Sequence, residues 1–366
     1  MRDNYLKTMT FQNLKTIKAI TKEVNTEDIF FTRAEQYQNK KMTDCKTTIE
    51  QVRFEFEKFK AKSDENNCGK SMELFLDTLQ KYLVAKHNFP NELFRLPREV
   101  FFDCLFDALL GVENEWKCYN YYFSTIELSL DDAERIIDSS NHFLDYNQEL
   151  FTLMQYSSYS YQMPIVFLLF LRFKQEKERE TEKDTRKILT ALTKLFTIHT
   201  LNYYKSNPEV DVFFDNLTKF IMSQNATKGA ILKKIKERID NFKASEDFKV
   251  FKKEKLYLSK CCNETQANIL RLLSVIVLQK GLMKFANTRN NSELIFDLIH
   301  YITIRNSFAV LREKVKQTYC IEKYDLANKF AEEINPRWSK KSAAEREAEL
   351  ADYIMNYLFS GDYDGC

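Results

Sequence analysis

Glycine and proline are scarce in this chain, with six and five residues among 366. A β-sheet protein of this size needs many more of both, because the tight turns between strands depend on them. The shortage predicts an all-α protein, an irregular multi-helix bundle. Apolar residues make up 44% of the chain and include 30 Phe, which is enough to fill a large core.

Glycine is also missing where a phosphate-binding loop would need it. Such loops use glycine so that backbone N–H groups approach the anion closely, and residues 1–68 contain none. The sequence therefore excludes a Walker or Rossmann loop, and we expect no cofactor.

Histidines are few, and the cysteines form no recognisable metal-binding motif. The four histidines, at 87, 142, 199 and 300, lie more than fifty residues apart, and the eight cysteines show neither a C-x-x-C pair nor zinc-type spacing. We expect no bound metal and interpret the cysteines as reduced structural thiols of a cytoplasmic protein, with a disulfide or metal role as the alternative. His199 is interpreted as a core histidine rather than a catalytic one.

One long apolar run stands out, from Met163 to Phe173. An amphipathic surface helix would have polar residues every third or fourth position, so this run predicts a central helix buried on nearly all sides. A bilayer-spanning helix needs about 20 apolar residues. Arg172 and the charged cluster 174–187 end the run first, so we predict no membrane span. The N-terminus leads into no apolar run of signal-peptide length, and secretion is not expected.

Polar and turn-forming residues suggest three parts. The segment 62–69 is free of large apolar residues and is the best candidate linker. We predict an N-terminal helical arm over 1–69, a central helical domain over 70–285 and a C-terminal helical domain over 286–366.

Helical spacing of apolar residues predicts helices beginning at Thr26 and Ser129 and helices over 11–20, 47–59, 71–89, 97–111, 163–173, 185–204, 210–222, 228–241, 268–282, 293–310, 314–330 and 343–359.

Charge gives a local signal only. The formal net charge is +2, so no overall basic field indicates nucleic-acid binding. The densest basic run lies between 228 and 260, interleaved with Phe and Tyr, and each phosphate that it neutralised would add salt-dependent affinity. The candidate DNA contacts are Lys233, Lys234, Lys236, Lys252 and Lys253. The alternative is a solvated polar face whose aromatic residues are core anchors.

Several short pieces occur in a suggestive order from residue 70 onward. They are Leu79 to Leu83 with Phe94, Pro164 to Phe170, Phe213-Phe214 before Leu217, Phe248 to Tyr257 leading into Ile269-Leu270-Arg271, then Lys314, Lys316, Tyr319, Trp338, and Arg346 with Leu350-Ala351-Asp352. In this order they resemble the helical middle and C-terminal region of GmrSD-type restriction endonucleases, which cut modified phage DNA.

The chain also departs from that family. The resemblance implies an N-terminal nucleotide-hydrolysing lobe with an Asp-Gly-Gln-Gln-Arg motif, and neither the motif nor room for the lobe is found ahead of residue 70. It also implies a metal-dependent His-Asn-His nuclease centre. The corresponding interval here, 298–306, contains His300 and Asn306 but no second histidine. These two residues are weak catalytic candidates and are interpreted as remnants.

Three functions follow as hypotheses. The first is a catalytically incomplete relative of these endonucleases, a DNA-contacting or partner-binding subunit in phage defence whose protein partner supplies nucleotide hydrolysis and cleavage. The alternative is a helical protein–protein interaction module with no nucleic-acid role. A third is a metal-dependent DNA endonuclease that uses His300 with Asp297 or Glu293.

Overall fold

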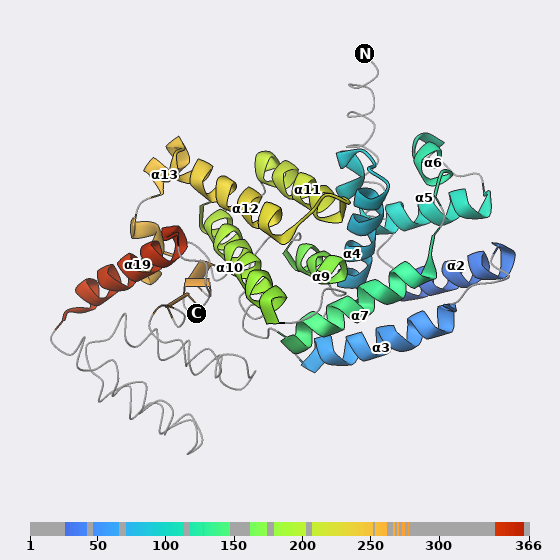
Figure 1. Cartoon of the computed structure of the whole chain (residues 1–366), viewed down its shortest axis with the longest axis horizontal. Coiled ribbons are helices and arrows are strands. Elements are labelled where there is room, and N and C mark those ends of the chain that lie inside the picture. Colours follow the sequence, from blue (N-terminus) through green and yellow to red (C-terminus); the bar gives the residue numbers. More distant parts are fainter. Residues whose placement is uncertain are drawn as a thin grey trace, which may run out of the picture. The chain divides into compact units, whose positions relative to one another are not determined.

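The fold is entirely helical in the part of the chain that the structure describes. The computed structural model describes residues 26–41, 47–65, 71–112, 117–126, 128–146, 162–173, 179–202, 207–251, 253–261, 266–267, 269–270, 273–274, 277 and 341–361. These ranges contain twelve α-helices, three short 3-10 helices and no strand (Figure 1). The predicted all-α fold is confirmed. Within the same ranges, no helix is both long enough and apolar enough to cross a membrane.

The chain divides into two compact units. The first comprises residues 1–64 and 69–138, and the second comprises 65–68 and 139–366. The division falls within helix α7 (Leu130–Tyr146). The domain boundaries expected after residues 69 and 285 stay a prediction.

Phenylalanine fills the core of the first unit. Its helices are α2 (Thr26–Lys41), α3 (Ile49–Glu65), α4 (Ser71–Lys86), η2 (Asn91–Phe94), α5 (Arg98–Leu110) and α6 (Lys117–Phe123). Helix α5 packs against α2, α4 and α6. The ring of Phe30 in α2 lies edge-on to Phe75, Phe102 and Phe106, with centroids 5.3, 5.6 and 5.8 Å away. Each such pair stabilises the fold by about 0.5–1.5 kcal/mol beyond the burial of its area.

Turn residues set the ends of α5 as predicted. Pro97 precedes its first residue, and Gly111 ends it with a φ of 69°. This left-handed conformation favours glycine because a Cβ atom would be strained there. Helix α3, by contrast, extends to Glu65 and so includes the first four residues of the segment expected to be a linker. Lys62 to Glu65 contain no glycine or proline to stop the helix.

The second unit is built around the predicted central helix. Its elements after α7 are α9 (Gln162–Phe173), α10 (Arg179–Asn202), α11 (Pro208–Met222), α12 (Lys228–Lys243), α13 (Glu246–Val250), η3 (Lys253–Leu256), η4 (Leu258–Lys260) and α19 (Ala343–Phe359). Every residue of α9 from Ile165 to Leu171 is at most 7% exposed, so the central helix is confirmed. Helix α9 packs against α11, and its Phe167 and Phe170 contact Phe143 of α7.

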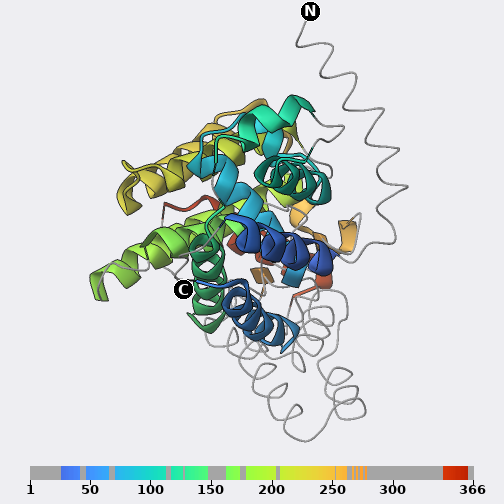
Figure 2. The same cartoon turned by 90° about the vertical axis from the view of Figure 1, so that its right-hand side faces the viewer.

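Helix α10 connects the remaining helices of this unit. It packs against α12 and against α19 (Figure 1), and Figure 2 shows α10 in the view turned by 90°. Helix α19 begins at a capping box, in which the Ser342 hydroxyl accepts from the Glu345 N–H and the Glu345 carboxylate accepts from the Ser342 N–H. The final helix predicted over 343–359 is therefore confirmed.

Candidate nucleic-acid interface

The candidate interface is the basic segment, which we define as residues 228–260. It carries eleven basic and five acidic residues. The fold builds it from α12, α13, η3 and η4. Polar caps start its two α-helices: the Thr227 hydroxyl accepts from the Ala230 N–H at 3.2 Å, and the Ser245 hydroxyl accepts from the Phe248 N–H at 3.3 Å.

An apolar stripe on α12 determines where its cations lie. Four residues at helical spacing are buried: Ile231, Ile235, Ile239 and Phe242. They form the core-facing side of a helix that packs against α10 and α11. The basic residues between them are therefore confined to the two flanks and the outer face.

The three predicted contacts on α12 occupy different surroundings. The Lys233 side chain is 77% exposed, and its Nζ lies 3.8 Å from Glu237 Oε1. The Nζ of Lys234, also an exposed residue, lies 4.6 Å from the ring centroid of Phe220 in α11. Lys236 is half-buried. Consecutive helical residues are about 100° apart around the axis, so Lys233 and Lys234 project to different sides.

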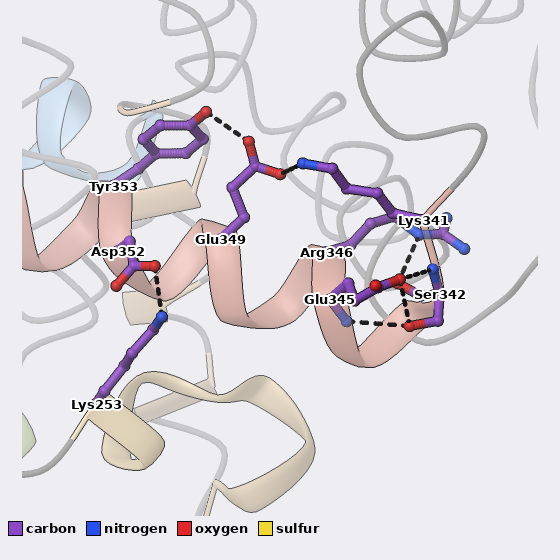
Figure 3. Close-up of polar contacts among 8 residues, drawn as sticks. All are labelled: Lys253, Lys341, Ser342, Glu345, Arg346, Glu349, Asp352 and Tyr353. Atoms are coloured by element: carbon purple, nitrogen blue, oxygen red, sulfur yellow. Dashed lines mark hydrogen bonds and ion pairs between the residues drawn. The ribbon is translucent and has the colours of Figure 1, made fainter.

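Lys253 is held by the C-terminal helix. Its Nζ lies 2.5 Å from Asp352 Oδ2 in α19, and the two side chains are 34% and 59% exposed (Figure 3). Lys252 lies outside the described residues. The fold therefore keeps Lys233 and Lys234 close along one helix and places Lys253 against α19. The DNA-binding role of these lysines stays a prediction.

Aromatic rings lie beneath several cations of the basic segment. The guanidinium of Arg238 lies 5.4 Å from the ring centroid of Phe213 in α11. Lys255 and Lys260 lie 5.7 and 5.3 Å from the rings of Phe251 and Tyr257. Cations over aromatic faces are attracted by the ring quadrupole. Two of the aromatic residues interleaved in the basic segment, Phe251 and Tyr257, thus lie beneath basic side chains.

The structure places one further cation, Arg172, near the start of the basic segment, which the sequence did not indicate. Arg172 at the end of α9 has its guanidinium 5.8 Å from the ring of Phe173, and the Lys228 Nζ lies 5.2 Å from the same ring. Arg172 Nη2 also donates to the Gln224 carbonyl at 3.4 Å. The sequence indicates Arg172 only as the end of an apolar run, because nothing around it points to Lys228, 56 positions away.

Helix α19 is attached along the basic segment by polar and aromatic contacts. The Glu347 carboxylate accepts from the Ser259 N–H at 2.8 Å and from its hydroxyl at 2.7 Å. Lys243 Nζ donates to the Phe359 carbonyl at 3.4 Å. The Phe359 ring contacts Phe242, Phe248 and Phe251, with centroids 6.2, 5.0 and 5.8 Å away.

The N-terminal half of α19 has its own polar contacts. Glu349 accepts from Lys341 Nζ, and its other carboxylate oxygen accepts from the Tyr353 hydroxyl at 2.7 Å (Figure 3). Arg346 is only 3% exposed, and its Nε donates to the Ser342 carbonyl at 3.4 Å. Three of the residues that carry the family resemblance at this end, Arg346, Leu350 and Ala351, are therefore buried packing residues.

His199 is fully buried in α10, as predicted for a core histidine. Burial, together with the nearby charge of Arg238, lowers the pKa of His199 to about 3, so the ring is neutral at neutral pH. Among the described residues, no group of three or more His, Cys, Asp or Glu could hold a metal ion. His300, Asn306, Asp297 and Glu293 lie outside the described residues.

Comparisons with protein-family models, with curated proteins and with solved structures found no match to this chain. The resemblance to GmrSD-type endonucleases stays a prediction.

Proposed function

We propose that this chain is a cytoplasmic helical subunit that contacts DNA through the basic segment. The observation that carries the proposal is that Lys233 and Lys234 of α12 are both exposed, within a segment that has eleven basic and five acidic residues. Basic side chains on a rigid helix neutralise backbone phosphates and release counterions, which gives affinity without reading the base sequence.

The contacts of Lys233 leave it available to a phosphate. Its pairing with Glu237 is an exposed interaction between residues four apart on one helix. Such pairs contribute about 0.3–0.5 kcal/mol. A phosphate oxygen can replace this carboxylate at small cost. Lys234 is likewise an exposed residue, and its ammonium contacts the ring of Phe220.

The biological setting of the proposal comes from the family resemblance. An incomplete relative of GmrSD-type endonucleases would act in phage defence beside a protein partner that supplies nucleotide hydrolysis and cleavage. His300 and Asn306 are, in this proposal, remnants of a nuclease centre.

A matched pair of substitutions tests DNA contact. Lys233→Gln and Lys58→Gln each remove one exposed lysine that pairs with a glutamate on its own helix. Binding to duplex DNA, with and without modified bases, is measured by fluorescence anisotropy over a series of salt concentrations. We expect Lys233→Gln to weaken binding and to reduce the salt slope by about 0.9, the value of one phosphate contact. Lys58→Gln should leave both unchanged. Equal effects of the two substitutions would contradict the proposal.

The second candidate function is a helical interaction module without nucleic acid. It is favoured by the involvement of the basic segment in internal contacts, with Arg238 and Lys255 over rings and Lys253 paired with Asp352. In that case Lys233→Gln would leave the capture of a partner from the native host unchanged, and the purified chain would bind no DNA.

A further inference from the structure

An acidic helix lies against the most basic segment of the described chain. Helix α19 carries four acidic residues and one basic residue, and that basic residue, Arg346, is buried. Its contacts with the basic segment recur along its length, from Glu347 on Ser259, through Asp352 on Lys253, to the Phe359 carbonyl on Lys243. The charges of the two elements are therefore complementary.

The contacts of α19 differ in how easily they exchange. Leu350, Ile354 and Leu358 are at most 2% exposed and fix the helix to the core of the second unit. Detaching α19 would expose all three side chains to water, which is strongly unfavourable. The Lys253–Asp352 pair is partly exposed to solvent. Exposed ion pairs contribute little to stability. This pair can therefore change partners while the helix remains in place.

We propose that Asp352 is a built-in competitor for Lys253. Without a ligand, the Asp352 carboxylate forms an ion pair with the Lys253 ammonium. An anionic group of a bound ligand, which is a DNA phosphate in the proposed function, displaces this carboxylate while α19 stays packed against the core. The exchange is a change of ion-pair partner in which no covalent bond forms or breaks. The identity of the ligand rests on the proposed function, whereas the competition itself rests on the geometry of α19.

The direct test is Asp352→Asn in the full chain. This variant removes the competing charge and keeps a side chain of similar shape. We expect affinity for duplex DNA to rise by about two- to fivefold, since fivefold corresponds to about 1 kcal/mol, the upper range for an exposed pair. In a chain that also carries Lys253→Gln, Asp352→Asn should raise the affinity for duplex DNA by less than about twofold, because there is no longer a Lys253 ammonium for Asp352 to pair with.

The control is Glu349→Gln on the same helix. It removes the same charge one turn away, from a residue that contacts Lys341 and Tyr353 (Figure 3). If Glu349→Gln and Asp352→Asn raise affinity equally, or if the Asp352→Asn effect persists without Lys253, the effect is a long-range field and the proposed competition is wrong.

Retention on immobilised heparin separates this inference from the proposed function. Asp352→Asn should elute at a higher salt concentration than the wild type. The elution of Glu349→Gln should shift by less than that of Asp352→Asn. If the wild type binds no DNA but this heparin shift is found, DNA contact is wrong and the competition stands. If Asp352→Asn leaves heparin elution unchanged, the competition is wrong even if the chain binds DNA. Circular dichroism of each variant confirms that the helices remain folded.

Discussion

Aromatic rings serve different purposes at two places, one in each unit. In the first unit, Phe30 is enclosed by the rings of Phe75, Phe102 and Phe106, and it is 1% exposed. In the second, Phe213 and Phe220 of α11 each lie beneath a cation of α12. The same residue type is a core filler in one place and a support for surface charge in the other. Interleaved Phe and Lys in a sequence therefore do not distinguish a packed face from a ligand-binding one.

The largest expected effect is on the aromatic core of the first unit. Phe30→Ala removes a ring that contacts four others and should lower the free energy of unfolding of this unit by about 3–5 kcal/mol. Urea titration followed by circular dichroism measures it. The matched control is Phe54→Ala, because this residue is 63% exposed. Its ring lies 4.3 Å from the Lys58 Nζ, so the substitution should lower stability by about 1 kcal/mol or less. Similar losses for the two variants would contradict the assignment of Phe30 to the core.

The buried histidine of the second unit gives the next effect, through pH. The pKa of His199 is lowered to about 3 in the folded chain, whereas its ordinary value is 6.5. Between these two pH values the unfolded chain binds one more proton than the folded chain. The contribution of His199 to the free energy of unfolding is therefore fully present above pH 6.5 and decreases as the pH falls below it. The slope from this group is about 1.4 kcal/mol per pH unit at most. Unfolding titrations between pH 7 and pH 5 should show a weaker dependence in His199→Gln; an identical slope would contradict the assignment.

A smaller effect is expected where a cation covers a ring. Lys234→Gln removes the ammonium above Phe220 and should lower stability by about 0.5–1 kcal/mol, the value of an exposed cation–π contact. Lys233 contacts Glu237 instead of a ring. Lys233→Gln should therefore change stability by about 0.5 kcal/mol or less. Both should weaken DNA binding. Thermal unfolding and DNA titration of the two variants thus separate support of the fold from contact with ligand.

Local sequence predicted most of the described helices because their ends carry turn chemistry, whereas the helices predicted over 11–20, 293–310 and 314–330 lie outside the described residues. Pro97 and Gly111 bound α5, Asn207 caps α11, and Ser342 caps α19. The uninterrupted apolar run likewise indicated the buried helix α9. Helix α10 begins at Arg179, before the start predicted at residue 185, since its first turns carry charged residues without apolar periodicity.

The candidate site was less predictable from sequence. The basic run was visible, but its partners were not: Ser259 meets Glu347 across 88 residues, and Lys243 meets Phe359 across 116. Spacing rules describe neighbours within one helix. They carry no information on which distant helix covers a charged segment, so the pairing of Lys253 with Asp352 became apparent only in the folded chain.

The measurement that tests the central claim most directly is the salt dependence of duplex DNA binding by the wild-type chain. If Lys233, Lys234 and Lys253 each neutralise one phosphate, the logarithm of the association constant should fall with the logarithm of salt concentration with a slope of about −3. A slope near zero, or no binding at low salt, would contradict a role for the basic segment in contacting DNA.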